Sequence, residues 1–114
     1  KNQSYNLLQC YRLKTLMEQN NHERIDVLKL DIEGAAIEVL QDVINSNIQP
    51  RQIIAEFEYS ETEEEINEDE FNKWSLDLKN LLNQFKNMNY KIFYIPRYTH
   101  IPYSTIEVLM QKNY

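Results

Sequence analysis

The chain is predicted to fold as an α/β protein with an open, mostly parallel sheet, and three observations support this prediction. The segment from Ile25 to Leu40 begins as an apolar run and continues with helical periodicity. A second apolar run from Gln52 to Tyr59 follows, so strand, helix and strand succeed one another within about 35 residues, as in a βαβ unit. Two later runs of β-branched and aromatic residues add a further pair of strands.

The composition is that of one folded domain with an acidic surface. The 114 residues are 42% hydrophobic and include eight tyrosines, four phenylalanines and one tryptophan, which is enough for a core. The net charge is −6, and phosphate backbones are held by Lys and Arg, so nucleic-acid binding is not expected. Cys10 is the only cysteine, which excludes an internal disulfide and favours a reducing compartment such as the cytoplasm. No membrane contact is expected, because no apolar run approaches the ~20 residues of a membrane span.

Two strands and two helices are predicted before the second apolar run. A short strand is expected over residues 7–11 and a helix over residues 13–18, and Cys10 is expected to be a small core residue. The near-continuous apolar run from Ile25 to Leu30 is typical of a strand that is covered on both faces. A helix is then predicted to begin near Gly34 and to end before Pro50.

An acidic segment separates the two halves of the chain. Residues 61–70 hold seven acidic side chains, so residues 60–70 are predicted to form a solvated loop. Asn67 and Glu70 have the spacing of a helix-capping pair ahead of an amphipathic helix from Phe71 to Met88. Strands are predicted over residues 90–95 and 105–110, and the connection is too short for a crossover helix, so they should be antiparallel neighbours.

Asp31 and Glu33 are the first candidates for a functional site. They follow a predicted strand directly and precede the only glycine, Gly34, and ligands of open α/β sheets bind at the carboxyl ends of strands. Carboxylates there can accept a proton from a substrate hydroxyl, bind a metal or hold a substrate. The alternative is that they cap the helix. Glu56 and Glu58 share a face of the next strand; Glu56 is the better candidate, and a solvated strand end is its alternative.

The remaining candidates have plainer interpretations. His22 and His100 are expected on the surface, because no second histidine or cysteine stands at metal-ligand spacing, and no metal site is expected. Tyr94, Tyr98 and Tyr103 either line the mouth of a substrate site or pack as ordinary strand aromatics.

The sequence Val27-Leu28-Lys29-Leu30-Asp31-Ile32-Glu33-Gly34-Ala35 resembles the leucine-lysine-isoleucine-aspartate-x-glutamate-glycine-alanine signature of the FkbM-type methyltransferases. Residues 50–58 are similar to the next strand of that family, which ends in a glutamate. Residues 89–95 are similar to its late glycine-tyrosine strand, with Asn89 in the place of the glycine. The resemblance runs from about Leu13 to the last strand. Ala36 and Glu58 depart from it, standing where the family usually has glutamate and many members have histidine; either change can alter substrate handling or mark an inactive copy.

The resemblance implies a Rossmann-like class I methyltransferase fold. The chain would be its C-terminal half, supplying strands 4-5-7-6 of the order 3-2-1-4-5-7-6, with the first of them an exposed edge. The implied reaction is methyl transfer from S-adenosylmethionine to a hydroxyl of a sugar or small metabolite. It assigns catalytic roles to Asp31, Glu33 and Glu56, and a cofactor contact to Asp31.

The resemblance also implies that part of the cofactor site lies elsewhere. The glycine-rich turn that holds the methionine part of the cofactor would lie before residue 1, so these 114 residues alone should bind it weakly or not at all. The missing N-terminal half of the domain is then a required partner. The competing hypothesis is a non-catalytic interaction module, which uses the acidic segment or the open sheet edge to bind a protein. A nucleotide-binding half of a reductase is a third possibility, which no dinucleotide fingerprint supports.

Overall fold

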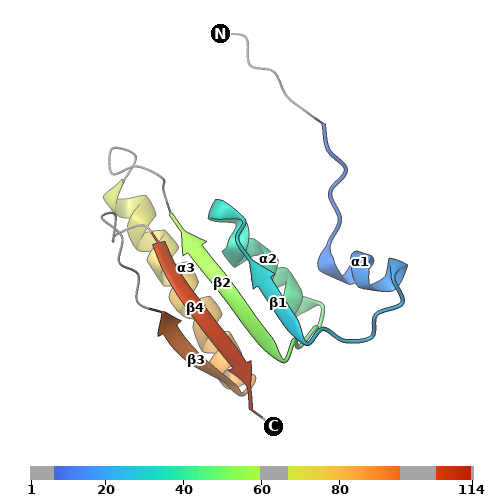
Figure 1. The fold of residues 1–114 in the computed structure, drawn as a ribbon. Helices are drawn as coiled ribbons and strands as arrows, with labels where there is room; N and C mark the ends of the chain where they lie inside the picture. The colour runs from blue at the N-terminus through green and yellow to red at the C-terminus, as the bar shows by residue number, and fades with distance from the viewer. Residues whose placement is uncertain (1–6, 60–66, 96–104, 114) are drawn as a thin grey trace.

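The computed structural model describes residues 7–59, 67–95 and 105–113, and all structural statements concern these residues. The elements in chain order are α1 (Leu13–Gln19), β1 (Val27–Leu30), the short 3-10 helix η1 (Glu33–Ala35), α2 (Ala36–Asn45), β2 (Gln52–Glu58), α3 (Glu68–Asn87), β3 (Tyr90–Ile95) and β4 (Thr105–Lys112) (Figure 1). No helix within the described ranges has the length and apolar character needed to span a membrane.

The four strands form one mixed sheet in the order β1-β2-β4-β3 (Figure 1). β1 is parallel to β2, which confirms the predicted βαβ unit. β4 is antiparallel to both of its neighbours, which confirms the predicted pairing of the last two strands. β1, β2 and β3 therefore run in one direction, and their carboxyl ends lie at the same edge of the sheet as the start of β4.

Both α2 and α3 pack on one face of the sheet (Figure 1). The alternation along β2 separates the two faces, because Ile53, Ala55 and Phe57 are buried while the residues between them are half-buried. The two helices are joined by reciprocal amide hydrogen bonds between Gln41 and Gln84, of 3.0 and 2.9 Å. The core lies between sheet and helices and includes Ala36, Leu40, Val43, Leu78, Leu81, Phe85, Val108 and Met110.

The other face of the sheet is open within the described part of the chain. The strand predicted over Ile25–Leu30 is shorter, Val27–Leu30, and it is not covered on both faces, since Val27 is 54% exposed. The prediction was wrong because β1 is at the edge of the described sheet and both packed helices lie on the same side. Its place at the edge agrees with the expectation of an exposed first strand.

The segment before the sheet differs from its prediction in two ways. Residues 7–12 form no strand, and Cys10 is exposed instead of belonging to the core. The physical reason is that none of the described strands pairs with this segment, which therefore lies outside the sheet and its core. The helix predicted next is confirmed as α1.

Arg12 connects this segment to α2. Its guanidinium donates hydrogen bonds to the Asp42 carboxylate at 2.8 to 3.2 Å and to Ser46 Oγ at 2.9 Å. The hydrogen bond to Asp42 raises the pKa of Arg12 above its ordinary value.

The acidic segment is only partly a loop. Glu68, Asp69 and Glu70 form the first turn of α3, so the loop predicted over residues 60–70 is wrong for these three; residues 60–66 lie outside the described residues. The predicted cap is confirmed, because Asn67 Oδ1 accepts hydrogen bonds from the backbone N–H groups of Asp69 at 3.0 Å and Glu70 at 3.2 Å. Negative side chains there complement the positive end of the helix dipole, which explains why acidic residues extend the helix.

Asparagine takes the usual place of glycine after each of the described α-helices. Asn21, Asn47 and Asn89 follow α1, α2 and α3, with φ values of 55°, 56° and 71°. This left-handed conformation ends many helices and is tolerated by asparagine better than by other non-glycine residues. These helices therefore end without a glycine, and asparagine takes the left-handed conformation instead.

Replacing Asn89 with alanine is expected to lower the free energy of unfolding by about 1–2 kcal/mol, because the left-handed conformation is costly for a residue with a plain Cβ. The change also removes the hydrogen bond from Asn89 Nδ2 to the backbone oxygen of Asn113, at 2.7 Å. Replacement with glycine, which suits the conformation, should cost less than about half of this. Urea unfolding measures both variants, and equal losses would assign the effect to the hydrogen bond instead of the backbone.

Candidate functional site

Asp31 and Glu56 lie at the same edge of the sheet. β1 ends at Leu30, which pairs with Ala55 of β2, and each candidate is the residue that follows this pair. The parallel register therefore places Asp31 beside Glu56, two residues before β2 ends at Glu58. Asp31 is exposed and Glu56 is half-buried on the open face of the sheet.

Gly34 lies in η1, which packs beside the end of β2. A Cβ added to Gly34 would lie 3.8 Å from the backbone oxygen of Glu58, an ordinary contact, and the φ angle of Gly34 is not positive. The described neighbours and the backbone conformation would therefore both accept a larger residue. Neither the described neighbours nor the backbone conformation requires a glycine at this position.

The helix-capping alternative for Asp31 is not what the structure shows. The N-cap of η1 is Ile32 and that of α2 is Ala35, and neither cap position makes a side-chain hydrogen bond. Glu33 is the first residue of η1. Asp31 thus reaches the edge of the sheet without serving as the cap of either helix.

Glu107 is a third acidic residue of the open face, and it was missed by the sequence reasoning. It pairs with Glu56 across the antiparallel strands, and Glu58 pairs with Thr105 beside it. All three glutamates are half-buried. The alternation of Ile106 and Val108 in the sequence signals that Glu107 points away from the core, but only the register shows that it faces Glu56. The face behind Asp31 is therefore more acidic than predicted.

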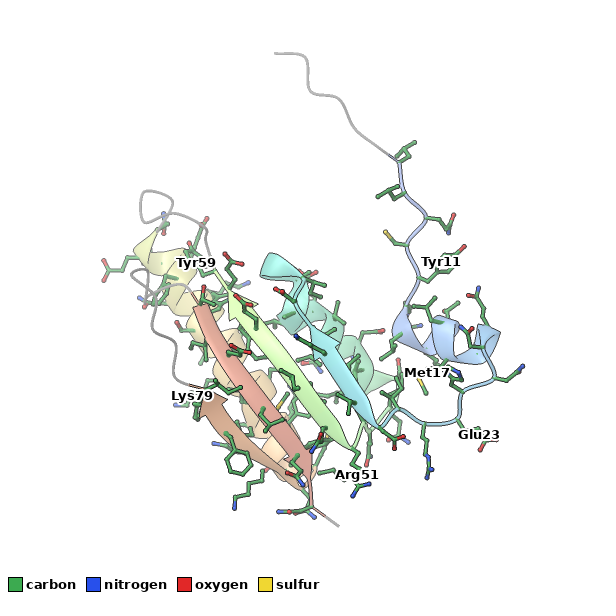
Figure 2. The ribbon with its side chains drawn as sticks, in the orientation of Figure 1. Tyr11, Met17, Glu23, Arg51, Tyr59 and Lys79 are labelled. Atoms are coloured by element: carbon green, nitrogen blue, oxygen red, sulfur yellow. The ribbon has the colours of Figure 1, made fainter. Side chains whose placement is uncertain are left out.

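An aromatic cluster stands beside this edge. The Tyr59 ring centroid lies 5.5 Å from that of Phe71 and 5.9 Å from that of Trp74, and the Phe71 and Trp74 centroids are 5.8 Å apart. The Tyr59 hydroxyl donates to the backbone oxygen of Asn67 at 3.5 Å or to Glu70 Oε2 at 3.4 Å. Figure 2 shows Tyr59 at the carboxyl end of β2, beside the start of α3. The cluster therefore holds the start of α3 against the end of β2.

The other sequence candidates fall outside this arrangement. His22 is exposed, as predicted, and Tyr94 is exposed on β3 instead of packing in the core. His100, Tyr98 and Tyr103 lie outside the described residues. No group of three or more His, Cys, Asp or Glu side chains in the described ranges could hold a metal ion.

Comparison with known proteins supports the family resemblance of the residues at this edge. The family model of the methyltransferase FkbM domain matches residues 1–92. The chain belongs to the FkbM methyltransferase family. The match contains the segment Val27–Ala35, so the family resemblance of the sequence is confirmed. It begins before Leu13, where the resemblance was expected to start, and it ends inside β3. No curated protein and no solved structure matches the chain.

Proposed function

We propose that this chain is the C-terminal part of an S-adenosylmethionine-dependent O-methyltransferase domain that acts on a hydroxyl of a sugar or small metabolite, in the cytoplasm. The observation that supports this most strongly is the position of Asp31 and Gly34. Both belong to the FkbM signature, and both lie where the parallel strands β1 and β2 end. Ligands of open α/β sheets bind at such an edge.

The acidic residues at this edge suit the positively charged sulfur of the cofactor. The sulfonium of S-adenosylmethionine is a cation, and the donor set here is anionic, with Asp31 exposed and Glu56 and Glu58 half-buried nearby in the sheet. Bound S-adenosylmethionine supplies an electrophilic methyl group. Asp31 would contact the cofactor, and Gly34, which has no side chain, would let the cofactor approach the backbone closely.

The same carboxylates can act on the methyl acceptor. Methyl transfer is an in-line displacement, so much of the rate comes from the positioning of the hydroxyl against the donor. Asp31 would accept a hydrogen bond from that hydroxyl and take its proton, with Glu33 and Glu56 orienting the acceptor from η1 and β2. No other described residue hydrogen-bonds to the Asp31 side chain, so its carboxylate is available for a ligand.

The unpaired edge of β1 and the uncovered face of the sheet support the half-domain proposal, namely that this chain is the C-terminal part of a larger methyltransferase domain. β1 has a described neighbour on one side only, and both packed helices leave the opposite face uncovered. Further strands paired with β1, and helices on the open face, would complete a doubly wound sheet. These would carry the glycine-rich turn for the methionine part of the cofactor, which the described residues lack.

We expect calorimetry to detect no S-adenosylmethionine binding at micromolar concentrations by the 114 residues alone. A polypeptide that also carries the preceding strands should bind the cofactor and transfer a labelled methyl group to hydroxyl acceptors, because it contributes the turn. Micromolar binding by the 114 residues would overturn the half-domain proposal and leave the cofactor proposal intact. Cofactor binding by the longer polypeptide without transfer to any hydroxyl would overturn the assignment as an O-methyltransferase.

A non-catalytic interaction module is the alternative, and the exposed edge of β1 favours it. An unpaired strand edge presents free backbone groups to another chain, and Val27 there is 54% exposed. The sequence preceding Lys1 discriminates between the two. A strand, a glycine-rich turn and an acidic residue about twenty positions later would support the enzyme, whereas an unrelated domain would support the interaction module.

A further inference from the structure

A groove opens between α3 and the strands β3 and β4 near the carboxyl edge of the sheet. On the helix-covered face of β3, exposure rises from 4% at Tyr90 to 59% at Tyr94. On the same face of β4, Val108 is buried, but Ile106 is 37% exposed although it pairs with the buried Phe57. Two apolar side chains at inward-facing positions are thus left uncovered by the described helices.

The groove has the size and lining of a small-molecule site. Its volume is about 360 Å³, within the range of known ligand pockets. Aromatic and aliphatic side chains make its floor, and they come from α3, β3 and β4: Phe71, Trp74, Leu78, Leu82, Tyr94 and Ile106. A floor of this kind favours an apolar ligand body.

The polar rim of the groove is positive on an acidic protein. Lys79 and Lys86 line it, spaced seven residues apart on one flank of α3, and no carboxylate does so among the described residues. Figure 2 shows Lys79 on the part of α3 beside the end of β3. The chain as a whole carries a net charge of −6, so this flank differs in sign from the rest. The groove therefore complements an anionic head group.

The ordinary roles of helix lysines account for Lys86 but not for Lys79. Lys73, on another flank of α3, lies 3.7 Å from Asp77, whereas neither Lys79 nor Lys86 is ion-paired to a described residue. Lys86 in the last turn complements the helix dipole, but Lys79 is too far from the end to do so. The lysines stand in the C-terminal half of the helix and the aromatic pair, Phe71 and Trp74, at its start, so the groove is polar at one end and apolar at the other.

We propose that this groove binds a small carboxylate with an acyl chain, such as a medium-chain fatty acid. The carboxylate would lie against Lys79 and Lys86, and the acyl chain would run along α3 toward Phe71 and Trp74. Phe71 and Lys79 are separated by about 12 Å along the helix, at 1.5 Å per residue, which suits an elongated ligand of medium chain length better than a compact one. The proposal does not depend on methyl transfer.

The single tryptophan makes the test direct, because Trp74 lines the groove. Titration of the 114-residue chain with decanoate should give a saturable change in tryptophan fluorescence, and decanol, which has no charge, should bind more weakly. Lys79→Gln and Lys86→Gln should each weaken decanoate binding roughly two- to fivefold, as expected for exposed ion pairs. Lys73→Gln makes the same charge change on another flank of the helix and should leave binding unchanged.

A second pair of variants tests the apolar floor. Tyr94→Ser should weaken decanoate binding, whereas Phe93→Ser, the next residue on the opposite face of β3, should not. Both side chains are exposed, so far-UV circular dichroism should show the same fold for both. The proposal is overturned if decanoate leaves the fluorescence unchanged below its micelle concentration. It is also overturned if Lys73→Gln or Phe93→Ser weakens binding as much as its groove counterpart.

Discussion

Replacing Phe57 with alanine is expected to lower the free energy of unfolding by about 3–5 kcal/mol, the usual cost of removing a buried phenylalanine side chain. Phe57 is 0% exposed and is among the largest fully buried side chains of the described core. It lies on the central strand β2, on the face covered by α2 and α3. Domains of this size are stable by only about 5–15 kcal/mol, so the urea midpoint should fall sharply.

Phe93→Ala is the matched control for this prediction. Phe93 is 42% exposed on the edge strand β3, on the open face of the sheet, and its loss should cost less than about 1 kcal/mol. A one-residue slip of register would exchange the faces of a strand. Equal losses from Phe57→Ala and Phe93→Ala would therefore contradict the assignment of the two faces.

The features that the sequence predicted correctly are those whose interactions lie within a short stretch of the chain. The cap at Asn67 follows from a side chain that bonds to backbone groups two and three residues away, so a short stretch of sequence contains the whole interaction. The strand Tyr90–Ile95 was predicted with its observed bounds, because a helix end precedes it and a proline follows it. The antiparallel pairing with β4 followed from the length of the connection.

The errors arose where a distant neighbour decides the outcome. An apolar run indicates burial, but Ile25–Leu30 became a partly exposed edge strand because no described strand lies on its outer side. The same lack of a neighbour left residues 7–12 without a strand and Cys10 exposed. Glu107 was missed as a neighbour of Glu56 because antiparallel register cannot be counted from either strand alone. Sheet order and register were needed in each case.

The sequence placed each candidate carboxylate near the end of a strand, and the assignment of a site to them stays a prediction. Asp31 and Glu56 were each expected near the end of a strand, and the parallel register brings them to the same edge of the sheet. The identity of the group that takes a proton depends on a ligand and on the protonation state of each carboxylate. A substitution that removes charge without changing shape is therefore the informative experiment.

Asp31→Asn is expected to lower the rate of methyl transfer by about 10²- to 10⁴-fold, the usual contribution of a general base. The measurement uses labelled S-adenosylmethionine and a polypeptide that carries both this chain and the preceding strands. The fold should be unaffected, because the Asp31 side chain is exposed and hydrogen-bonds to no other described residue. Asparagine keeps the size of the side chain and removes its ability to take a proton.

Asp26→Asn is the control, because Asp26 is exposed at the opposite end of β1 and carries the same charge. Its rate should equal that of the unmodified protein. The two proposed roles of Asp31 separate in the kinetics: loss of a base lowers kcat at an unchanged cofactor affinity, whereas loss of a cofactor contact raises the cofactor KM. If Asp31→Asn and Asp26→Asn behave alike, Asp31 has neither role, and the same experiment on Glu56 becomes the test of whether the carboxylates of this edge take part in the reaction.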